Sequence, residues 1–329
     1  MEKMTLASKE AKKEKHHRLR VHKCRRGDRW RDLLTEQPLE ASARLDLLPP
    51  HAVSALILRE DCKALREVRH RIPEIVQAAQ LFSASIVNGG RVFYVGAGTS
   101  GRMGVIDAAE LPPTFGLPPT GKGSAVGVIA GGARALRRSQ EGAEDDAEAG
   151  RRAIRSAKRG DLVIGISASS MATFVRAALE EAKAGGAATA LVTMNRIRKP
   201  RFVDVLIAVE VGPEVIAGST RMKSGLVTKA ILHNISTTAM VLAKKIYGNR
   251  MVDLQPWCAK LKARSERILC EIGGVEIRRA RRLLKESGGN VKAALVMARL
   301  GCDRTRAEEI LEEVGGDLRS ALMRRENQR

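Results

Sequence analysis

The stretch Arg91-Val92-Phe93-Tyr94-Val95-Gly96-Ala97-Gly98-Thr99-Ser100-Gly101-Arg102 decides the fold of this chain. It begins with a β-prone run, continues with three glycines and two hydroxyl residues, and leads into helix-compatible sequence. Glycines at such a turn allow positive φ angles and a close approach of the backbone to a ligand. The first N–H groups of the following helix favour an anion. We therefore predict a phosphate-binding turn between a strand and a helix.

On both sides of this turn the sequence alternates between strand and helix patterns. Residues 52–88 repeat apolar side chains every three or four positions, and Pro73 divides this run into two helices. The later segments are predicted strands at 125–130, 161–167, 188–194 and 203–211. The predicted helices are at 133–157, with an interruption by the acidic cluster at 141–146, at 171–184 and from about 221 to 247. This alternation predicts an α/β fold with a doubly wound parallel sheet covered by helices on both faces. Its ligands are expected beyond the carboxyl ends of the strands.

The last sixty residues carry an internal repeat. Gly274, Ala280, Leu283, Gly288-Gly289 and Leu295 recur 27 positions later as Gly301, Ala307, Ile310, Gly315-Gly316 and Leu322. Two copies of helix–Gly-Gly–helix predict a small all-helical module, similar to ubiquitin-associated (UBA-like) folds, with a structural role. The predicted domains are thus a basic tail at 1–33, a ligand-binding domain at 34–262 and a helical module at 263–329.

The bulk composition limits the possible functions. The net charge is +21, and residues 1–33 alone hold twelve Lys/Arg against five Asp/Glu. We interpret this tail as a solvated extension, because it has one aromatic residue and no nucleic-acid motif; DNA binding through it is a weaker alternative. The five scattered cysteines form no CxxC pair, which predicts reduced thiols in a cytoplasm and no metal site. No apolar run is long enough to span a membrane.

The glycine spacing Gly96-x-Gly98-x-x-Gly101 also fits a dinucleotide-binding turn. Such a site needs an acidic residue at the end of the second strand to hold the ribose. Here that strand ends in Ala130-Gly131-Gly132, without an acid. The hydroxyls of Thr99 and Ser100 suit a phosphomonoester better, so we do not expect a dinucleotide site here.

Several longer blocks, in order, resemble N-acetylmuramic acid 6-phosphate etherases. They are residues 96–102, 107–116, 129–132, 141–146, 212–223 and 247–253, and the resemblance runs from Thr35 to the C-terminus. It implies a sugar isomerase (SIS) fold and a cytoplasmic homodimer without a cofactor. It also implies cleavage of the lactyl ether of N-acetylmuramic acid 6-phosphate, giving N-acetylglucosamine 6-phosphate and D-lactate during peptidoglycan recycling. Glucokinase regulatory proteins share the signature at 218–223 and imply the alternative, a non-catalytic sugar-phosphate sensor.

The resemblance implies an elimination followed by addition of water. A base removes the proton at C2 of the open-chain sugar, and an acid protonates the lactate oxygen at C3. The motif match assigns the acid to Glu110 and the base to Glu144, although the two roles could be exchanged. Glu110 is expected in an apolar setting that raises its pKa, and Glu144 among acidic neighbours. The predicted substrate-binding residues are Gly98, Thr99, Ser100, Gly101, Arg102, Ser167, Ser169, Ser170, Glu214, Ser219, Thr220 and Lys223.

One turn departs from the family pattern. The etherases have Ala-Ala-Ser-Gly-Arg-Thr-Pro-Tyr after the third strand, whereas this chain has Ser170, Met171 and Ala172 in place of the glycine, the arginine and the hydroxyl residue. Loss of a cation and a hydroxyl is expected to weaken phosphate binding there, at about 1.5–3 kcal/mol for each charged hydrogen bond. Ser167 and Ser170 are alternative donors.

Overall fold

A five-stranded parallel sheet forms the centre of the molecule. The computed structural model describes Trp30 and residues 32–324, so nearly all of the predicted basic tail lies outside it. The strands are β1 (Val92–Gly96), β2 (Ala125–Ile129), β3 (Leu162–Ile166), β4 (Ala188–Thr193) and β5 (Val205–Ala208), in the order β2-β1-β3-β4-β5. This topology confirms the predicted doubly wound sheet.

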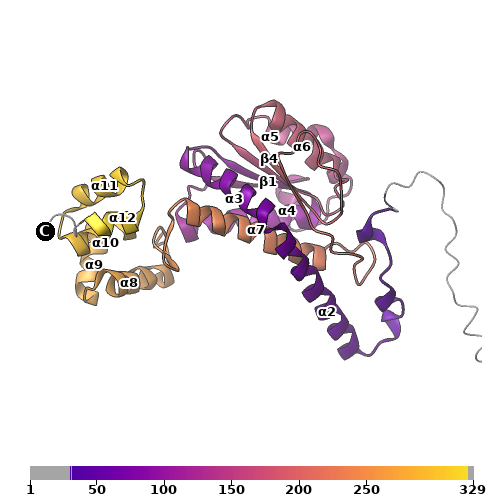
Figure 1. The fold of residues 1–329 in the computed structure, drawn as a ribbon, viewed down its shortest axis with the longest axis horizontal. Helices are drawn as coiled ribbons and strands as arrows, with labels where there is room; N and C mark the ends of the chain where they lie inside the picture. Colours follow the sequence, from indigo (N-terminus) through magenta and orange to yellow (C-terminus); the bar gives the residue numbers. More distant parts are fainter. Residues whose placement is uncertain (1–29, 31, 325–329) are drawn as a thin grey trace, which may run out of the picture.

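Helices cover both faces of this sheet, as Figure 1 shows. One layer consists of α3 (Ile72–Val87), α4 (Gly98–Phe115) and α7 (Lys223–Leu242), and the other of α5 (Ala147–Ile154) and α6 (Thr173–Ala184). Successive side chains of β1 pack into the hydrophobic cores on opposite faces of the sheet, because side chains alternate along a strand. Tyr94 packs under α4 and α7, whereas Phe93 and Val95 pack under α6. Both faces of the sheet are therefore buried.

The N-terminal helices begin where the sequence predicts. α2 (Pro50–Val68) and α3 are separated by a short 3-10 turn, η4 (Arg69–Arg71), and Pro73 lies in the first turn of α3. A proline is tolerated there because the first N–H groups of a helix have no intrahelical acceptor. Before α2, three 3-10 turns follow each other: η1 (Leu34–Glu36), η2 (Glu40–Ser42) and η3 (Leu45–Leu47).

The glycines of the opening stretch allow β1 and α4 to pack closely. A Cβ on Gly101 would lie 2.6 Å from Cγ1 of Ile129 and 2.7 Å from the carbonyl oxygen of Gly96. A Cβ on Gly96 would lie 2.6 Å from the amide nitrogen of Gly101. A larger residue at either position would push the helix away from the strand ends. Gly98 has a φ of 52° and begins α4 directly after the strand.

The helix predicted at 133–157 is interrupted at the acidic cluster 141–146, as expected, but the part predicted before that cluster is not α-helical. Residues 132–136 and 143–145 form the short 3-10 turns η5 and η6, and only Ala147–Ile154 are α-helical. Gly142 has a φ of 71°, which interrupts the helix, and the side chain of Asp146 accepts a hydrogen bond from the amide of Ala149 to start α5. The segment before α5 is consequently a loop at the edge of the sheet.

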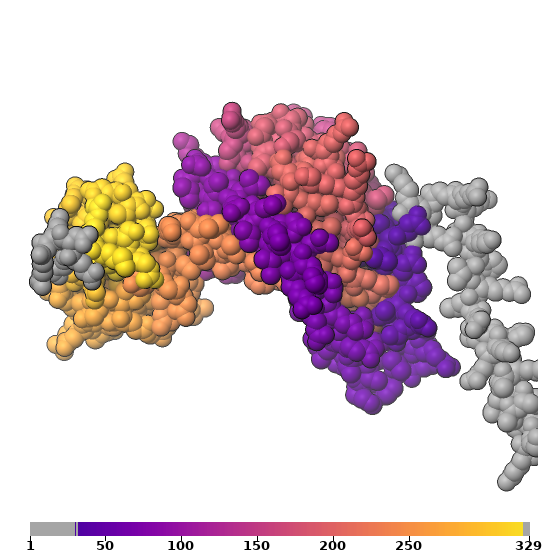
Figure 2. All heavy atoms as spheres, in the orientation of Figure 1, coloured from indigo at the N-terminus to yellow at the C-terminus, as the bar shows by residue number. Residues whose placement is uncertain are grey.

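The C-terminal helices have a hydrophobic core of their own. They are α8 (Ala259–Gly273), α9 (Ile277–Glu286), α10 (Val291–Leu300), α11 (Arg304–Glu313) and α12 (Leu318–Met323), and the repeat corresponds to the pairs α9–α10 and α11–α12. In the space-filling view these helices form a separate lobe beside the part that contains the sheet (Figure 2). Their core also includes Val252, which follows the small hairpin of β6 (Ile246–Tyr247) and β7 (Arg250–Met251). The predicted boundary at 262/263 falls inside α8, and we propose a boundary near residue 245 instead.

A buried lysine joins this lobe to the end of α7. The ammonium group of Lys292 donates to the carbonyl oxygens of Lys244 and Gly316, at 2.7 and 2.9 Å, and lies 2.7 Å from Asp253. Within the described chain, no helix is both long and apolar enough to cross a membrane.

Candidate functional site

A polar cavity of about 240 Å³ opens at the carboxyl ends of the strands. Three connections line most of it: β1–α4 with Gly98, Thr99 and Ser100, β3–α6 with Ser167 and Ser169, and the segment before α7 with Thr220. These residues are far apart in the sequence, and the common direction of parallel strands places them at one edge. The structure thus brings together six of the twelve predicted substrate-binding residues.

Helix N-termini, rather than cationic side chains, supply the positive electrostatic potential at this cavity. Gly98–Ser100 form the first turn of α4 and Ala172 precedes α6, whereas the first amides of α7, at Lys223 and Ser224, already donate to the carboxylate of Glu214. The N-terminus of an α-helix carries partial positive charge and N–H groups without intrahelical acceptors. No lysine or arginine is among the described residues that line the cavity. An anion bound here would be held by backbone amides and hydroxyl groups.

Among the described residues that line this cavity, Glu144 is one of two carboxylates. It lies in η6, and its backbone carbonyl accepts a hydrogen bond from the hydroxyl of Thr173 at the start of α6. Glu144 is exposed as a whole residue, but partial desolvation at the cavity wall raises the pKa of its carboxyl, and the negative charges of Asp145 and Glu141 raise it further. A carboxyl with a raised pKa is a stronger base than an ordinary one and titrates nearer to neutral pH.

Glu110 has a different environment from the predicted one. It was expected in an apolar setting, but it is exposed on α4 and does not line the cavity of its own chain. Ten residues of helix separate it from Ser100, a rise of about 15 Å. The apolar setting was expected from the sequence neighbours Ala108 and Leu111. These two side chains point into the core, on the other side of the helix from Glu110.

Glu214 and Lys223 are buried behind the cavity. The carboxylate of Glu214 accepts hydrogen bonds from the amides of Lys223 and Ser224, at 3.2 and 2.9 Å, and from the Ser224 hydroxyl at 2.6 Å. The ammonium group of Lys223 pairs with Glu60 of α2 at 3.4 Å. Both side chains thus already have protein partners, and they fix the start of α7. Their direct contact with a substrate stays a prediction.

Four further predicted residues lie beside the cavity rather than on its wall. They are Gly101, which is buried between α4 and β2, Arg102, whose Nε donates to the carbonyl of Leu136, Ser219, which lies in the turn before α7, and Ser170. Described residues with metal-ligating side chains form no group of three or more that could hold a metal ion.

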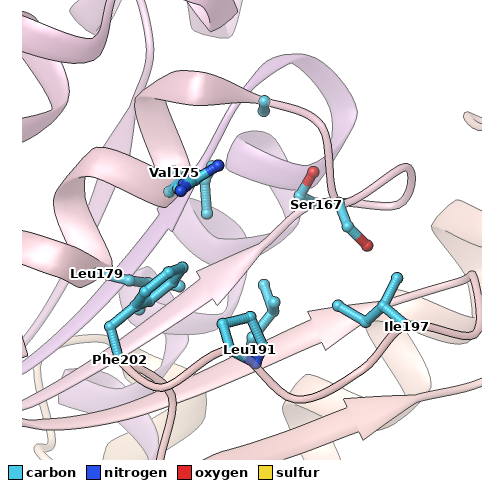
Figure 3. Close-up of a pocket in the computed structure, with 10 residues that line it drawn as sticks. Ser167, Val175, Leu179, Leu191, Ile197 and Phe202 are labelled. Carbon is cyan, nitrogen blue, oxygen red and sulfur yellow. The ribbon is translucent and has the colours of Figure 1, made fainter. Parts of the chain in front are cut away.

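The turn that departs from the family pattern faces two cavities. Ser169 lines the polar one, Ser170 lines a second, mostly apolar cavity of about 230 Å³, and Ala172 lines both. Figure 3 shows this second cavity between α6 and the β4–β5 connection, with Val175, Leu179 and Phe202 around it. Ser170 keeps a left-handed conformation, with a φ of 65°, although it is not glycine. Its hydroxyl lies 2.5 Å from that of Thr193.

Two residues of the N-terminal segment line the polar cavity and were not among the predicted ones. They are Trp30 and Glu36, and Glu36 is the second carboxylate in the described part of the cavity wall. The sequence offered one signal for Glu36, because the resemblance to the etherases begins at Thr35. Its position depends on contacts with residues far along the chain, which no local pattern shows.

Comparisons with known proteins agree with the predicted resemblance. An N-acetylmuramic acid 6-phosphate etherase of Gloeobacter violaceus is 47% identical over 270 residues, which cover 80% of this chain and 87% of that protein. One of Symbiobacterium thermophilum is 44% identical over 266 residues, with 80% and 88% covered. The family of glucokinase regulatory protein N-terminal SIS domains matches residues 74–183. Phosphoheptose isomerase GmhA from Neisseria gonorrhoeae aligns at a TM-score of 0.42 and 18% identity, covering 56% of this chain and 96% of that one.

Proposed function

This chain belongs to the N-acetylmuramic acid 6-phosphate etherase family, and we propose that it is a carbon–oxygen lyase that converts N-acetylmuramic acid 6-phosphate to N-acetylglucosamine 6-phosphate and D-lactate. The observation that carries the proposal is the convergence of Thr99, Ser100, Ser167, Ser169 and Glu144 on one cavity. Hydroxyls and helix N-termini suit the phosphate, and a carboxylate with a raised pKa suits proton abstraction from carbon.

In the proposed reaction Glu144 is the base. It removes the proton at C2 of the open-chain sugar, and the electrons of the C2–H bond form a C2–C3 double bond as the C3–oxygen bond breaks. The departing lactate oxygen takes a proton from a general acid. Water then adds at C3, and a proton returns to C2. The negative neighbours of Glu144 help because they raise its basicity.

We further propose that the acid is Glu110 of a second copy of the chain. Glu110 is exposed on α4, one helical turn after Ile106, whose side chain is 45% exposed. Leu226 on the neighbouring helix α7 is 39% exposed. Burying these apolar side chains between two copies would stabilise a homodimer. In that dimer Glu110 would act at the cavity of the second copy, because it does not reach the cavity of its own chain. The four described cysteines are free thiols, which fits a cytoplasmic enzyme.

Release of D-lactate from N-acetylmuramic acid 6-phosphate tests this function. The wild-type protein is expected to release lactate, and Glu144→Gln to lose about 10²–10⁴-fold in kcat, the usual contribution of general acid–base catalysis. Glu148→Gln is the matched control, because Glu148 lies on the exposed side of α5 and does not line the cavity. Sugar phosphates that raise the Tm of the wild-type protein without any lactate release would indicate a regulatory protein instead.

A further inference from the structure

The segment Leu34–Glu36 brings a second carboxylate into the polar cavity. Glu36 lines this cavity together with Glu144, Thr99 and Thr220. Its Oε2 atom would lie only 2.9 Å from a Cβ placed on Gly218, so the carboxylate sits directly against the backbone of that glycine. Gly218 has a φ of 76°, and the absence of a side chain there leaves room for Glu36.

A buried asparagine holds this segment in place. Oδ1 of Asn195 accepts a hydrogen bond from the amide of Leu34 at 2.9 Å, and its Nδ2 donates to the Thr35 hydroxyl at 3.2 Å. The same Nδ2 donates to the carbonyl of Ala168, in the turn after β3, at 2.9 Å. Asn195 is 2% exposed and Thr35 is fully buried. Asn195 therefore ties the residue before Glu36 to the turn that carries Ser169.

A second attachment comes from the other wall of the cavity. The amide of Gly218 donates to the carbonyl oxygen of Thr35 at 3.0 Å. Thr35 is thus bonded through its side chain to the connection after β4 and through its backbone to the connection before α7. Such fixation on two sides is what a catalytic side chain requires, because proton transfer depends on a defined geometry.

The proposed reaction contains a proton transfer for which no group has been assigned. The proton at C2 is acidic only when C1 is an aldehyde, whereas a pyranose ring has a hydroxyl at C1. Ring opening must therefore precede elimination, and it moves a proton from O1 to O5. In the proposed reaction Glu144 removes the C2 proton, and Glu110 of a second copy protonates the lactate oxygen. Among the described residues that line the cavity, Glu36 is the other carboxylate.

We propose that Glu36 opens the sugar ring. Its carboxylate takes the proton of the C1 hydroxyl, the C1–O5 bond breaks as the C1–O1 double bond forms, and the same carboxyl gives the proton to O5. The carboxylate is regenerated, so the step needs no further reactant. This inference deepens the proposed function and rests on it. Asn195 is then a positioning residue that acts through Thr35.

Interconversion of the two anomers of N-acetylglucosamine 6-phosphate, followed by exchange NMR, isolates this step. It requires ring opening and closing but neither elimination nor lactate. The wild-type enzyme is expected to accelerate the interconversion, and Glu36→Gln to lose at least ~100-fold of that acceleration and of lactate release. Glu40→Gln is the matched control, because Glu40 is exposed in η2 and does not line the cavity. It is expected to keep both activities.

The binding of the product separates proton transfer from mere positioning. Glu36→Gln is expected to keep the rise in Tm that N-acetylglucosamine 6-phosphate causes in the wild-type enzyme. Loss of that rise would overturn the inference, because Glu36 would then hold the ligand rather than transfer a proton. Wild-type anomer interconversion by Glu36→Gln would overturn it too, and would leave the proposed function intact. A wild-type protein that releases no lactate would instead overturn the proposed function.

Discussion

Removing the side chain of Asn195 should detach the segment that carries Glu36. Asn195→Ala deletes two hydrogen bonds to this segment, the one accepted from the amide of Leu34 and the one donated to the Thr35 hydroxyl. Each such bond stabilises a protein by about 1 kcal/mol net, so the docked state should lose roughly 2 kcal/mol. That loss corresponds to a shift of about 30-fold in the equilibrium between docked and detached segment.

Hydrogen exchange at the amide of Gly218 measures this shift. That amide donates to the carbonyl of Thr35, and Asn195 does not contact it, so its exchange reports docking and not the mutated bonds themselves. Exchange is expected to become about 30-fold faster in Asn195→Ala. Lactate release should fall by at most the same factor, because catalysis by Glu36 requires the docked segment.

Thr35 provides a graded control. Thr35→Val keeps the shape of the buried side chain and removes only the hydroxyl that accepts from Asn195, so about 1 kcal/mol and a fivefold change are expected. In Thr35→Ser, which keeps the hydroxyl, the amide of Gly218 should exchange more slowly than in Thr35→Val. Unchanged exchange at Gly218 in Asn195→Ala would refute the reasoning, because the segment would then be held by other contacts.

Two more predictions concern the acidic loop and the altered turn. The proposed base Glu144 must be ionised to accept a proton, so kcat/KM should fall as the pH drops through its raised pKa. Asp145→Asn and Glu141→Gln remove two causes of that rise and should move this acidic limb of the pH–rate profile to lower pH, whereas an unmoved limb would assign it to another group. Ser170→Gly should be about 1 kcal/mol more stable than Ser170→Ala, because both lose the hydrogen bond to Thr193 but only alanine keeps the cost of a left-handed φ; equal Tm values by calorimetry would contradict this.

The arrangement of the turns could be predicted because one rule of topology determines it. Strands β1 and β3 were recognisable as apolar runs, and they pair in parallel. The turns that follow them, with Thr99 and Ser167, therefore meet at one edge of the sheet. The repeat at 274–322 was predictable for a similar reason, since its Gly-Gly pairs end helices at equal spacing. These features follow from periodicity alone.

The environment of single side chains could not be predicted in this way. The exposure of Glu110 depends on which side of α4 faces the sheet, and its immediate neighbours in the sequence belong to the buried side. Glu36 depends on Asn195, which is 160 residues away from Thr35. The α-helix predicted before the acidic cluster does not form, although alanines and charged residues there favour helices; the interruption predicted at 141–146 is present and includes the positive φ of Gly142.

The altered turn bears on how the cavity could hold an anion, and the weaker phosphate binding expected from it stays a prediction. With Met171 in place of the arginine, the described cavity wall contains no lysine or arginine and presents hydroxyls and the N-termini of α4 and α6. The altered residue with the strained backbone, Ser170, lies at the neighbouring apolar cavity. With the anion held by backbone amides, the carboxylates Glu36 and Glu144 can face the sugar without a cation that would pair with them. A site for proton transfer between carbon and oxygen benefits from this, because an adjacent lysine or arginine would lower the pKa of both carboxylates and make them weaker bases.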